Sequence, residues 1–568
     1  MRGVSKTADL LRIIDLPRRS LASIDEDLVF LLTDAYKTDT GTMTLRPIQA
    51  LALSEFHDNQ GLLGSMPVGS GKTLVSFLAP VVANSKRPLL LIPAKLANKT
   101  IKEFEELAKH WKSVPIKIMN YELLSRERGM QELNDYKPDC IVMDECHRAK
   151  NTKAAVTKRL KRYIKQHNPT VAAISGTITR KSIKDYWHIL EWTHGDNKPL
   201  PNKWNEMADW SNALDEDVLP WARLAPGKLD MLCDEEELAA IAANPKKPLA
   251  AIRSAYRRRL GDTPGVITLN TKSVESSLLV EQVLFKHTSS VVLDAFKHLR
   301  ESWESPDGYA FSQAVDLWRT ARQLACGFYY KWDPRPPQEW LDCRREWASF
   351  ARKILGNNRR GIDSELQLVN ACDRGEYSNV ELEAWRFTKE TFKPNVVPVW
   401  LDLSVIEYAT KWLTKNKGIV WVEHVSVGEK ISEVSGFSYF GESGKSSERE
   451  RIEQARGPII ASISANGEGR NLQAWDKNLV ISCPPSGATW EQLLGRTHRQ
   501  GQESDSVTYQ VFISCIELWT GYEKAKRDAL YIQDTTGQSQ KLLSCDKDEI
   551  TEDKIKSLIK SKNNAWGK

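Results

Sequence analysis

The chain has 568 residues, which is too long for one hydrophobic core, so several domain-sized units are expected. Its 41% hydrophobic and 27% charged residues are typical of a globular protein and exclude a mainly disordered chain. The net charge of +6 permits a polyanionic partner without requiring one. The nine cysteines form no Cys-x-x-Cys pair, which argues against a zinc module and favours a reducing compartment.

Apolar runs separated by helical segments predict two α/β units. After a helical lead-in over residues 1–43, the first unit covers residues 44–195 and contains the runs PLLLIPA, CIVMDE and TVAAISGT. Residues 196–395 are rich in Trp and Arg with little strand signal, so they predict a helical insertion. The second unit, residues 396–535, contains KGIVWVEH, GPIIASIS and KNLVISCPP, and residues 536–568 are a tail. Such runs fit buried strands of a parallel sheet with crossover helices.

The segment PVGSGKT has the composition of a phosphate-binding loop. Such a loop needs glycines so that backbone N–H groups can surround the anion, a lysine for the β- and γ-phosphates, and a hydroxyl for Mg²⁺. The apolar run after Thr73 supplies a helix whose N-terminus faces the phosphates. Met66 replaces the first glycine of the usual pattern, so a glycine-rich strand-to-helix turn is the alternative. The expected ATP-binding residues are Pro67, Val68, Gly69, Ser70, Gly71, Lys72 and Thr73.

An acid pair, Asp144 and Glu145, ends a later apolar run. Asp144 can hold Mg²⁺ together with Thr73, and Glu145 can polarise water for attack on the γ-phosphate. Two acids after a strand are also common turn residues, so the pair alone leaves both interpretations open. Together with the phosphate loop, the acid pair predicts a site for ATP and Mg²⁺.

Further motifs accompany these two in a fixed order. The first unit carries LRPIQ, LLIPAKL, MNYELLS, DECHRAKN and ISGTI, and the second carries YFGESGKSSERERIEQA, SANGEGRNLQAWDKNLVIS and GRTHRQGQ. In this order the chain resembles superfamily-two helicases, and within them the Swi/Snf-type DNA translocases. The resemblance implies an α/β fold of two RecA-like parallel-sheet lobes with a helical insertion between them. It also implies a compact bacterial or phage-like member.

The resemblance implies roles for residues outside the loop and the acid pair. Gln49 would contact the adenine, and Gly467 and Gly469 would meet the ribose. Coupling between the nucleotide site and the second lobe would depend on His147, Ser175 and Thr177.

The segment EQLLGRTHRQGQ places Arg496 and Arg499 three residues apart, on one helical face with Gln492. One interpretation is a solvated basic helix end. In the resembling family this motif carries arginine fingers, which supply charge to the γ-phosphoryl group during its transfer. The implied catalytic residues are therefore Lys72, Asp144, Glu145, Arg496 and Arg499, and Gln492 joins the ATP-binding set.

Nucleic-acid contacts without sequence preference are made to phosphates rather than to base edges. Between residues 316 and 360, basic residues alternate with aromatic ones, which fits either base stacking or an aromatic core. We expect Trp318 and Trp347 to lie in such a core, with neighbouring arginines on a phosphate-facing surface. The predicted nucleic-acid contacts are Lys95, Asn120, Arg180, Asn466, Arg470, Arg344 and Arg345.

These patterns predict an ATP-dependent motor that moves on duplex DNA without sequence preference. Two alternatives stay open: a strand-separating DNA or RNA helicase, and a non-hydrolysing nucleic-acid clamp or remodeller of a DNA-bound protein such as a polymerase. The N-terminal segment lacks a secretory signal and no window reaches about 18 uninterrupted apolar residues, so no membrane partner is expected. We expect the cytoplasm of a bacterium or of a phage-infected host cell.

Overall fold

The computed structural model divides into two compact units. It describes residues 2–19, 26–66, 69–176, 178–179, 182–245, 248–268, 276–287, 289–357, 364–378, 380–393, 395–447, 450–467 and 469–550. Unit 1 comprises Met1–Glu275, Ser486–Gln502 and Ala525–Ser544, and unit 2 comprises Ser276–Pro485, Glu503–Lys524 and Cys545–Lys568. Two stretches from the C-terminal third of the chain therefore belong to unit 1.

Unit 1 is built around a six-stranded parallel sheet with the strand order β3-β2-β4-β5-β1-β6. Its strands are β1 (Gly61–Ser65), β2 (Pro88–Ile92), β3 (Lys117–Asn120), β4 (Cys140–Asp144), β5 (Thr170–Ser175) and β6 (Val266–Ile267). The register pairs Ser65 with Ser175 and Asp144 with Ile174. The last residues of β1, β4 and β5 therefore lie at one edge of the sheet, where ligands of parallel α/β sheets bind.

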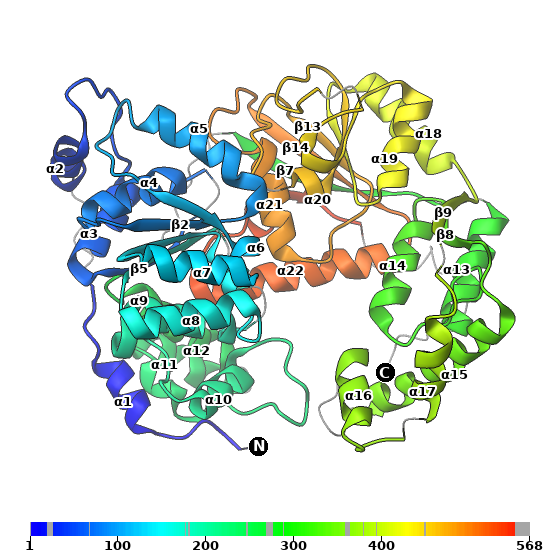
Figure 1. Ribbon diagram of the computed structural model, residues 1–568, viewed down its shortest axis with the longest axis horizontal. Helices are drawn as coiled ribbons and strands as arrows, with labels where there is room; N and C mark the ends of the chain where they lie inside the picture. Colours follow the sequence, from blue (N-terminus) through cyan, green and yellow to red (C-terminus); the bar gives the residue numbers. More distant parts are fainter. Residues whose placement is uncertain are drawn as a thin grey trace. The chain divides into compact units, whose positions relative to one another are not determined.

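Helices cover both faces of this sheet. The helices of unit 1 are α1 (Ala8–Asp15), α2 (Glu26–Tyr36), α3 (Pro47–Asn59), α4 (Lys72–Val82), α5 (Ala97–Leu107), α6 (Tyr121–Leu124), α7 (Glu127–Tyr136), α8 (Ala155–His167), α9 (Lys184–His194), α10 (Trp204–Leu214), α11 (Glu235–Ala243), α12 (Leu249–Gly261), α21 (Gly487–Thr497) and α23 (Lys541–Ser544). Figure 1 shows α4 and α5 on one side and α7, α8 and α9 on the other. Along β2, Leu89 and Leu91 pack in one core cluster and Leu90 and Ile92 in the other. Both faces of the sheet are buried, which explains the uninterrupted apolar runs.

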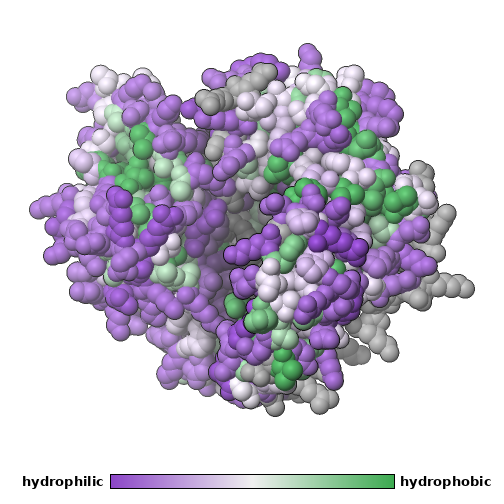
Figure 2. Space-filling model, turned by 45° about the vertical axis from the view of Figure 1, so that its right-hand side comes forward, coloured by the Kyte–Doolittle hydropathy of each residue, from purple (hydrophilic) through white to green (hydrophobic). Residues whose placement is uncertain are grey.

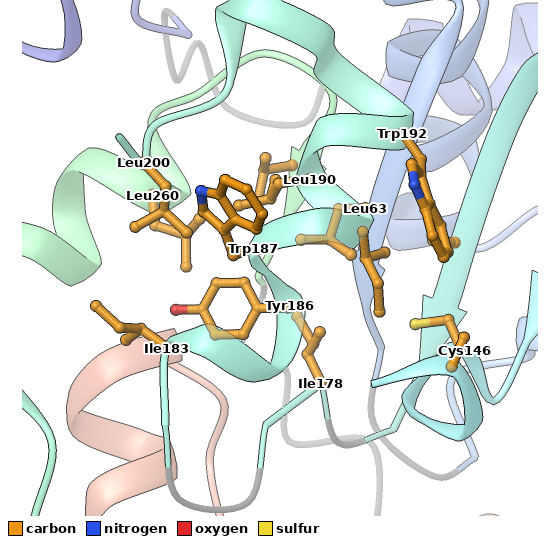
Figure 3. Close-up of a cluster of buried hydrophobic side chains, with 14 of the residues drawn as sticks. Leu63, Cys146, Ile178, Ile183, Tyr186, Trp187, Leu190, Trp192, Leu200 and Leu260 are labelled. Carbon is orange, nitrogen blue, oxygen red and sulfur yellow. The ribbon is translucent and has the colours of Figure 1, made fainter. Parts of the chain in front are cut away.

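The core on the α9 side is aromatic as well as aliphatic. Tyr186, Trp187 and Trp192 of α9 pack there with Ile178 and Cys146 (Figure 3). Burial, followed by the neighbouring carboxylates Glu145 and Asp144, raises the pKa of the Cys146 thiol. Cys146 is therefore a small apolar core residue, not a nucleophile.

Unit 2 contains a seven-stranded parallel sheet with the order β11-β12-β10-β13-β14-β7-β15. Its strands are β7 (Ser277–Leu284), β10 (Ile419–Val422), β11 (Tyr439–Phe440), β12 (Ile459–Ser462), β13 (Lys477–Val480), β14 (Ser506–Ile513) and β15 (Asp546–Asp548). All eight residues of β7 pair with β14. The expectation of little strand structure between residues 196 and 395 is therefore wrong at β7. The polar pair Glu281 and Gln282 interrupts the apolar pattern of β7, so this segment carries no clear strand signal.

The rest of unit 2 is mainly helical. Its helices are α13 (Ser290–Ser302), α14 (Ala314–Leu324), α15 (Gln338–Asn357), α16 (Glu365–Asp373), α17 (Val380–Lys389), α18 (Ser404–Lys415), α19 (Val425–Ser435) and α20 (Ile463–Asn466), and α22 (Ile516–Thr536) has residues in both units. An antiparallel pair, β8 (Phe328–Asp333) with β9 (Asn395–Trp400), completes it. Trp340, Trp347 and Trp385 form the centre of a separate core in α15–α17, so the predicted burial of Trp347 is confirmed. Trp318 is only half-buried, contrary to expectation.

The two parallel sheets with their helices confirm the predicted α/β class. The predicted boundaries between lead-in, lobes, insertion and tail stay predictions. Figure 2 shows hydrophilic side chains over most of the visible face, with hydrophobic patches between them. Among the described residues, no helix combines the length and apolar composition that a bilayer crossing requires.

Candidate nucleotide site

The phosphate loop joins β1 to α4 through two left-handed glycines. Gly69 has φ 91° and Gly71 has φ 83°, and Gly71 caps the helix that begins at Lys72. A Cβ added to Gly71 would lie 2.0 Å from Gln49 Nε2, so no larger residue fits there without rearrangement. A Cβ added to Gly69 would meet no heavy atom within 4 Å. The loop therefore has the tight left-handed turn expected of a phosphate-binding loop.

Two residues of the LRPIQ segment hold this loop. Arg46 N donates to Gln49 Oε1 over 2.8 Å, and Gln49 Nε2 donates to the carbonyl oxygens of Gly71 and Ser70 over 3.2 and 3.4 Å. Arg46 Nη1 donates to Gly69 O over 2.7 Å, and Arg46 Nη2 donates to Gln500 Oε1. Arg46 was not predicted as a site residue, although it lies three residues before Gln49 in a quoted motif. The adenine contact assigned to Gln49 stays a prediction.

Glu145 occupies the centre of the polar contacts at the edge of the sheet. Its φ of 53° and ψ of 49° are left-handed, a conformation that costs a non-glycine residue about 1 kcal/mol or more. Lys72 Nζ lies 3.6 Å from Glu145 Oε1, and Ser175 Oγ donates to Glu145 Oε2 over 3.1 Å. Two predicted residues, Lys72 of the loop and Ser175 at the end of β5, therefore contact the carboxylate of Glu145, a third predicted residue.

His147 completes this contact set. Its Nδ1 lies 2.9 Å from Ser175 Oγ and 3.3 Å from Glu145 Oε2. Because the single hydroxyl proton of Ser175 goes to Glu145, the proton between His147 and Ser175 must come from His147 Nδ1. The structure therefore brings together two of the three predicted coupling residues, and the third, Thr177, lies outside the described residues.

Burial and neighbouring charges shift the pKa values of Asp144 and Glu145 in opposite directions. Burial, and then the adjacent Glu145 carboxylate, raises the pKa of Asp144. Burial alone would also raise the pKa of Glu145, but the Lys72 ammonium and the hydrogen bonds from His147 and Ser175 outweigh it and lower the pKa. Glu145 is thus held ionised, as a residue that orients water must be.

The predicted magnesium ligands have suitable chemistry. The Thr73 hydroxyl and the Asp144 carboxylate are hard oxygen donors of the kind that Mg²⁺ prefers. Thr73 follows Lys72 and Asp144 precedes Glu145 in the chain. The ion pair between Lys72 and Glu145 therefore brings the segments of both predicted ligands together. Tyr121 OH donates to Asp144 O over 2.9 Å and fixes the backbone there. The residues present therefore fit Mg²⁺ with ATP.

Arg496 and Arg499 belong to unit 1, the unit of the phosphate loop. Arg496 is only 5% exposed, and its Nε donates to Gln492 O over 2.8 Å. Burial lowers the pKa of Lys99 on α5, and both arginines lower it further, while Glu103 opposes them. Burial also lowers the pKa of Arg499, again opposed by Glu103. A solvated helix end is therefore excluded for Arg496, and the role of both arginines as fingers stays a prediction.

The remaining predicted nucleotide residues lie elsewhere. Pro67 and Val68 are outside the described residues. Gly467 and Gly469, the predicted ribose contacts, belong to unit 2, and Gly469 has φ 75°. Their contact with the ribose stays a prediction.

The predicted nucleic-acid residues of the two α/β units have mixed outcomes. Lys95 is exposed, and Asn120 caps α6 by accepting from Leu123 N over 2.6 Å. Arg470 pairs with Glu453 at 2.8 Å. Asn466 is fully buried and its Nδ2 donates to Phe440 O over 2.8 Å, so its side chain supports the fold and the prediction is corrected. Arg180 lies outside the described residues.

The prediction for Arg344 is corrected as well. Arg344 is 3% exposed, and its guanidinium donates to Ala310 O over 3.1 Å and pairs with Glu365 at 3.0 Å. It lies four residues after Trp340 and three before Trp347, on the buried face of α15. Arg345 is on the exposed side, and it pairs with Glu304 at 2.8 Å and Asp342 at 2.7 Å.

A comparison with protein families covers the part of unit 1 that holds this site. The model of the DEAD/DEAH box helicase family matches residues 46–186. This segment is therefore similar to the domains of that helicase family. It includes the phosphate loop, Glu145 and Ser175, and helicase domains of this kind use ATP with a divalent metal and bind nucleic acid. The match indicates an ATP-hydrolysing enzyme of the helicase type. No curated protein matches the chain.

Proposed function

We propose that the helicase-type ATPase works as a motor that moves along duplex DNA without separating its strands. ATP hydrolysis is supported by one observation above all: Lys72, Ser175 and His147 contact the Glu145 carboxylate. The loop that contains Lys72 has the left-handed glycines of a phosphate-binding turn. The duplex DNA substrate is supported by the resemblance to Swi/Snf-type translocases in both α/β units.

The site residues would each have a separate role in ATP hydrolysis. The loop amides and Lys72 bind the phosphates, and Thr73 and Asp144 hold Mg²⁺, which neutralises phosphate charge when bound. Glu145 orients the attacking water, while Ser175 and His147 hold its carboxylate in place. Arg496 and Arg499 supply positive charge to the phosphoryl group as it is transferred. Phosphoryl transfer needs little else, because its catalysis consists mainly of positioning and charge stabilisation.

Movement without sequence preference requires contacts to the DNA backbone. Lys95, which is exposed after β2, is the best-placed predicted contact in unit 1, and Arg470 is its counterpart in unit 2. The net charge of +6 is compatible with a polyanionic track. In the resembling family, ATP binding and hydrolysis alternate between two arrangements of the lobes, and this alternation would drive the movement.

Duplex DNA is expected to stimulate ATP hydrolysis more than single-stranded DNA or RNA, and unrelated duplex sequences should act equally. Backbone contacts release counterions, so DNA affinity should fall steeply with salt, by about 10³ or more between roughly 50 and 200 mM if six or more phosphates are contacted. Steady-state ATPase rates with each nucleic acid, and binding isotherms at several salt concentrations, measure both effects.

The same experiment separates the alternatives. Stronger stimulation by RNA or single strands would favour a strand-separating helicase. Tight nucleic-acid binding without any hydrolysis would favour a clamp or a remodeller of a DNA-bound protein. A flat salt response or dependence on one DNA sequence would contradict backbone tracking.

A further inference from the structure

Polar side chains at the end of α22 and just after it are deeply buried in unit 1. Thr535, Thr536, Gln538 and Gln540 are each no more than 1% exposed. Polar groups at such depth are costly unless they are hydrogen-bonded. The two threonine hydroxyls donate to the carbonyl oxygens of Tyr531 and Ile532, one turn earlier in the helix, over 2.7 Å. Gln538 differs because its partners are distant in sequence.

The Gln538 amide bridges two strand ends at the edge of the sheet. Its Oε1 accepts from Ser65 Oγ over 3.2 Å, and its Nε2 donates to Gly176 O. Ser65 is the last residue of β1, just before the phosphate loop, and Gly176 follows Ser175. Since Ser175 donates to Glu145, Gln538 holds the backbone next to a residue that orients the proposed catalytic carboxylate.

Three residues later, the same stretch contacts α21, the helix that carries Arg496, and the segment that follows this helix. Lys541 N donates to Glu491 Oε2 over 2.6 Å, and Lys541 Nζ lies 3.2 Å from His498 Nδ1. Glu491 is 2% exposed and lies five residues before Arg496 on α21. Burial raises the pKa of Glu491, and Lys541 and Lys72 oppose this rise, so both cations lie near it.

We propose that Gln538 is a positioning residue for ATP hydrolysis, and that Gln538 and Lys541 together fix α21 relative to the ends of β1 and β5. The proposal rests on the proposed function, because positioning matters only if Glu145 and the arginines act on ATP. All of its contacts lie within unit 1. Gln538 acts through Ser65 and Gly176.

The test replaces Gln538 with methionine, which has nearly the same shape but neither of the amide's hydrogen-bonding groups. We expect Gln538→Met to lower kcat by about tenfold or more, because small misplacements of catalytic groups cost up to about 10²-fold. The KM for ATP should change by less than about threefold, because Lys72 and the loop amides still bind the phosphates. Amide hydrogen exchange should increase in peptides that contain Ser65 and Gly176, and this second measurement does not depend on activity.

Gln540→Met is the matched control. Gln540 is as deeply buried, but within the described part of the chain its side chain donates only to the carbonyl oxygens of Gln538 and Ser539, over 3.4 and 3.5 Å. The Gln540→Met variant should lose about as much thermal stability as Gln538→Met, but its kcat should stay close to that of the wild type. Equal kcat for both variants, or a loss of kcat that follows the melting temperature in both, would overturn the proposal.

Ser65→Ala is the second variant if Gln538→Met does not fold. It removes one of the two bonds of the amide and leaves Gln538 in place, so a smaller loss of kcat and increased exchange at Gly176 are expected. Wild-type kcat and unchanged exchange in this variant would contradict the proposal. If the wild-type protein itself hydrolyses no ATP, the proposed function fails, whereas the exchange experiment still reports whether Gln538 orders the two strand ends.

Discussion

Replacing Arg499 with alanine is expected to slow DNA-stimulated ATP hydrolysis by roughly 10³-fold, the scale measured for loss of an arginine finger. The side chain lies in unit 1 with the phosphate loop, and its pKa is lowered by burial. A partly desolvated guanidinium stabilises transition-state charge more than a solvated one does. Nucleotide affinity should fall much less, because Lys72 and the loop amides bind the phosphates. The measurement is kcat at saturating duplex DNA, together with ATP affinity.

His498→Ala is the control within the same segment. His498 lies between the two arginines and contacts Lys541, whose backbone N also donates to Glu491. Since that bond remains in His498→Ala, this variant should lose much less kcat than either arginine variant. Arg496→Ala should resemble Arg499→Ala, with an additional loss of stability because Arg496 is buried and bonded to Gln492 O. Equal tolerance of alanine at all three positions would show that these side chains are not fingers and that the transition-state charge has another source.

Glu145→Gln is expected to bind ATP while its turnover falls by at least about 10²-fold. Glutamine keeps the shape of the side chain but lacks the negative charge that polarises water, and it cannot form the ion pair with Lys72. ATP affinity and single-turnover hydrolysis, measured separately, distinguish these two effects.

Lys72→Ala provides the contrast to Glu145→Gln. Removal of the ammonium group should abolish detectable ATP binding, because the phosphates lose their closest expected cation. Wild-type hydrolysis by Glu145→Gln would exclude Glu145 as the water-orienting residue. Normal ATP binding by Lys72→Ala would exclude the loop as the phosphate site.

The strands of the fold could be predicted where burial on both faces leaves an uninterrupted apolar run. PLLLIPA became β2 and CIVMDE became β4, since the two faces of each strand pack in different core clusters. Strand β7 was missed because Glu281 and Gln282 interrupt its pattern, and its pairing partner β14 lies far along the chain. Tertiary pairing of this kind leaves no local signal.

The site could be predicted where phosphate chemistry dictates residue type and spacing, as at Lys72 and Glu145. Gln538 could not be predicted, because the two residues it holds precede it by 473 and 362 positions. Arg344 was assigned to a surface because alternation of basic and aromatic residues does not reveal which face of α15 is buried. The helical phase relative to Trp340 and Trp347 was the signal that could have corrected it.

Displacement of a third strand from a DNA triplex tests the central claim most directly, because a motor that tracks an intact duplex removes the third strand without opening the duplex. The account predicts displacement that requires ATP, that is lost in Glu145→Gln, and that proceeds while a forked duplex of equal length stays paired. Separation of the forked duplex without displacement of the third strand would contradict duplex translocation and assign the chain to the strand-separating helicases.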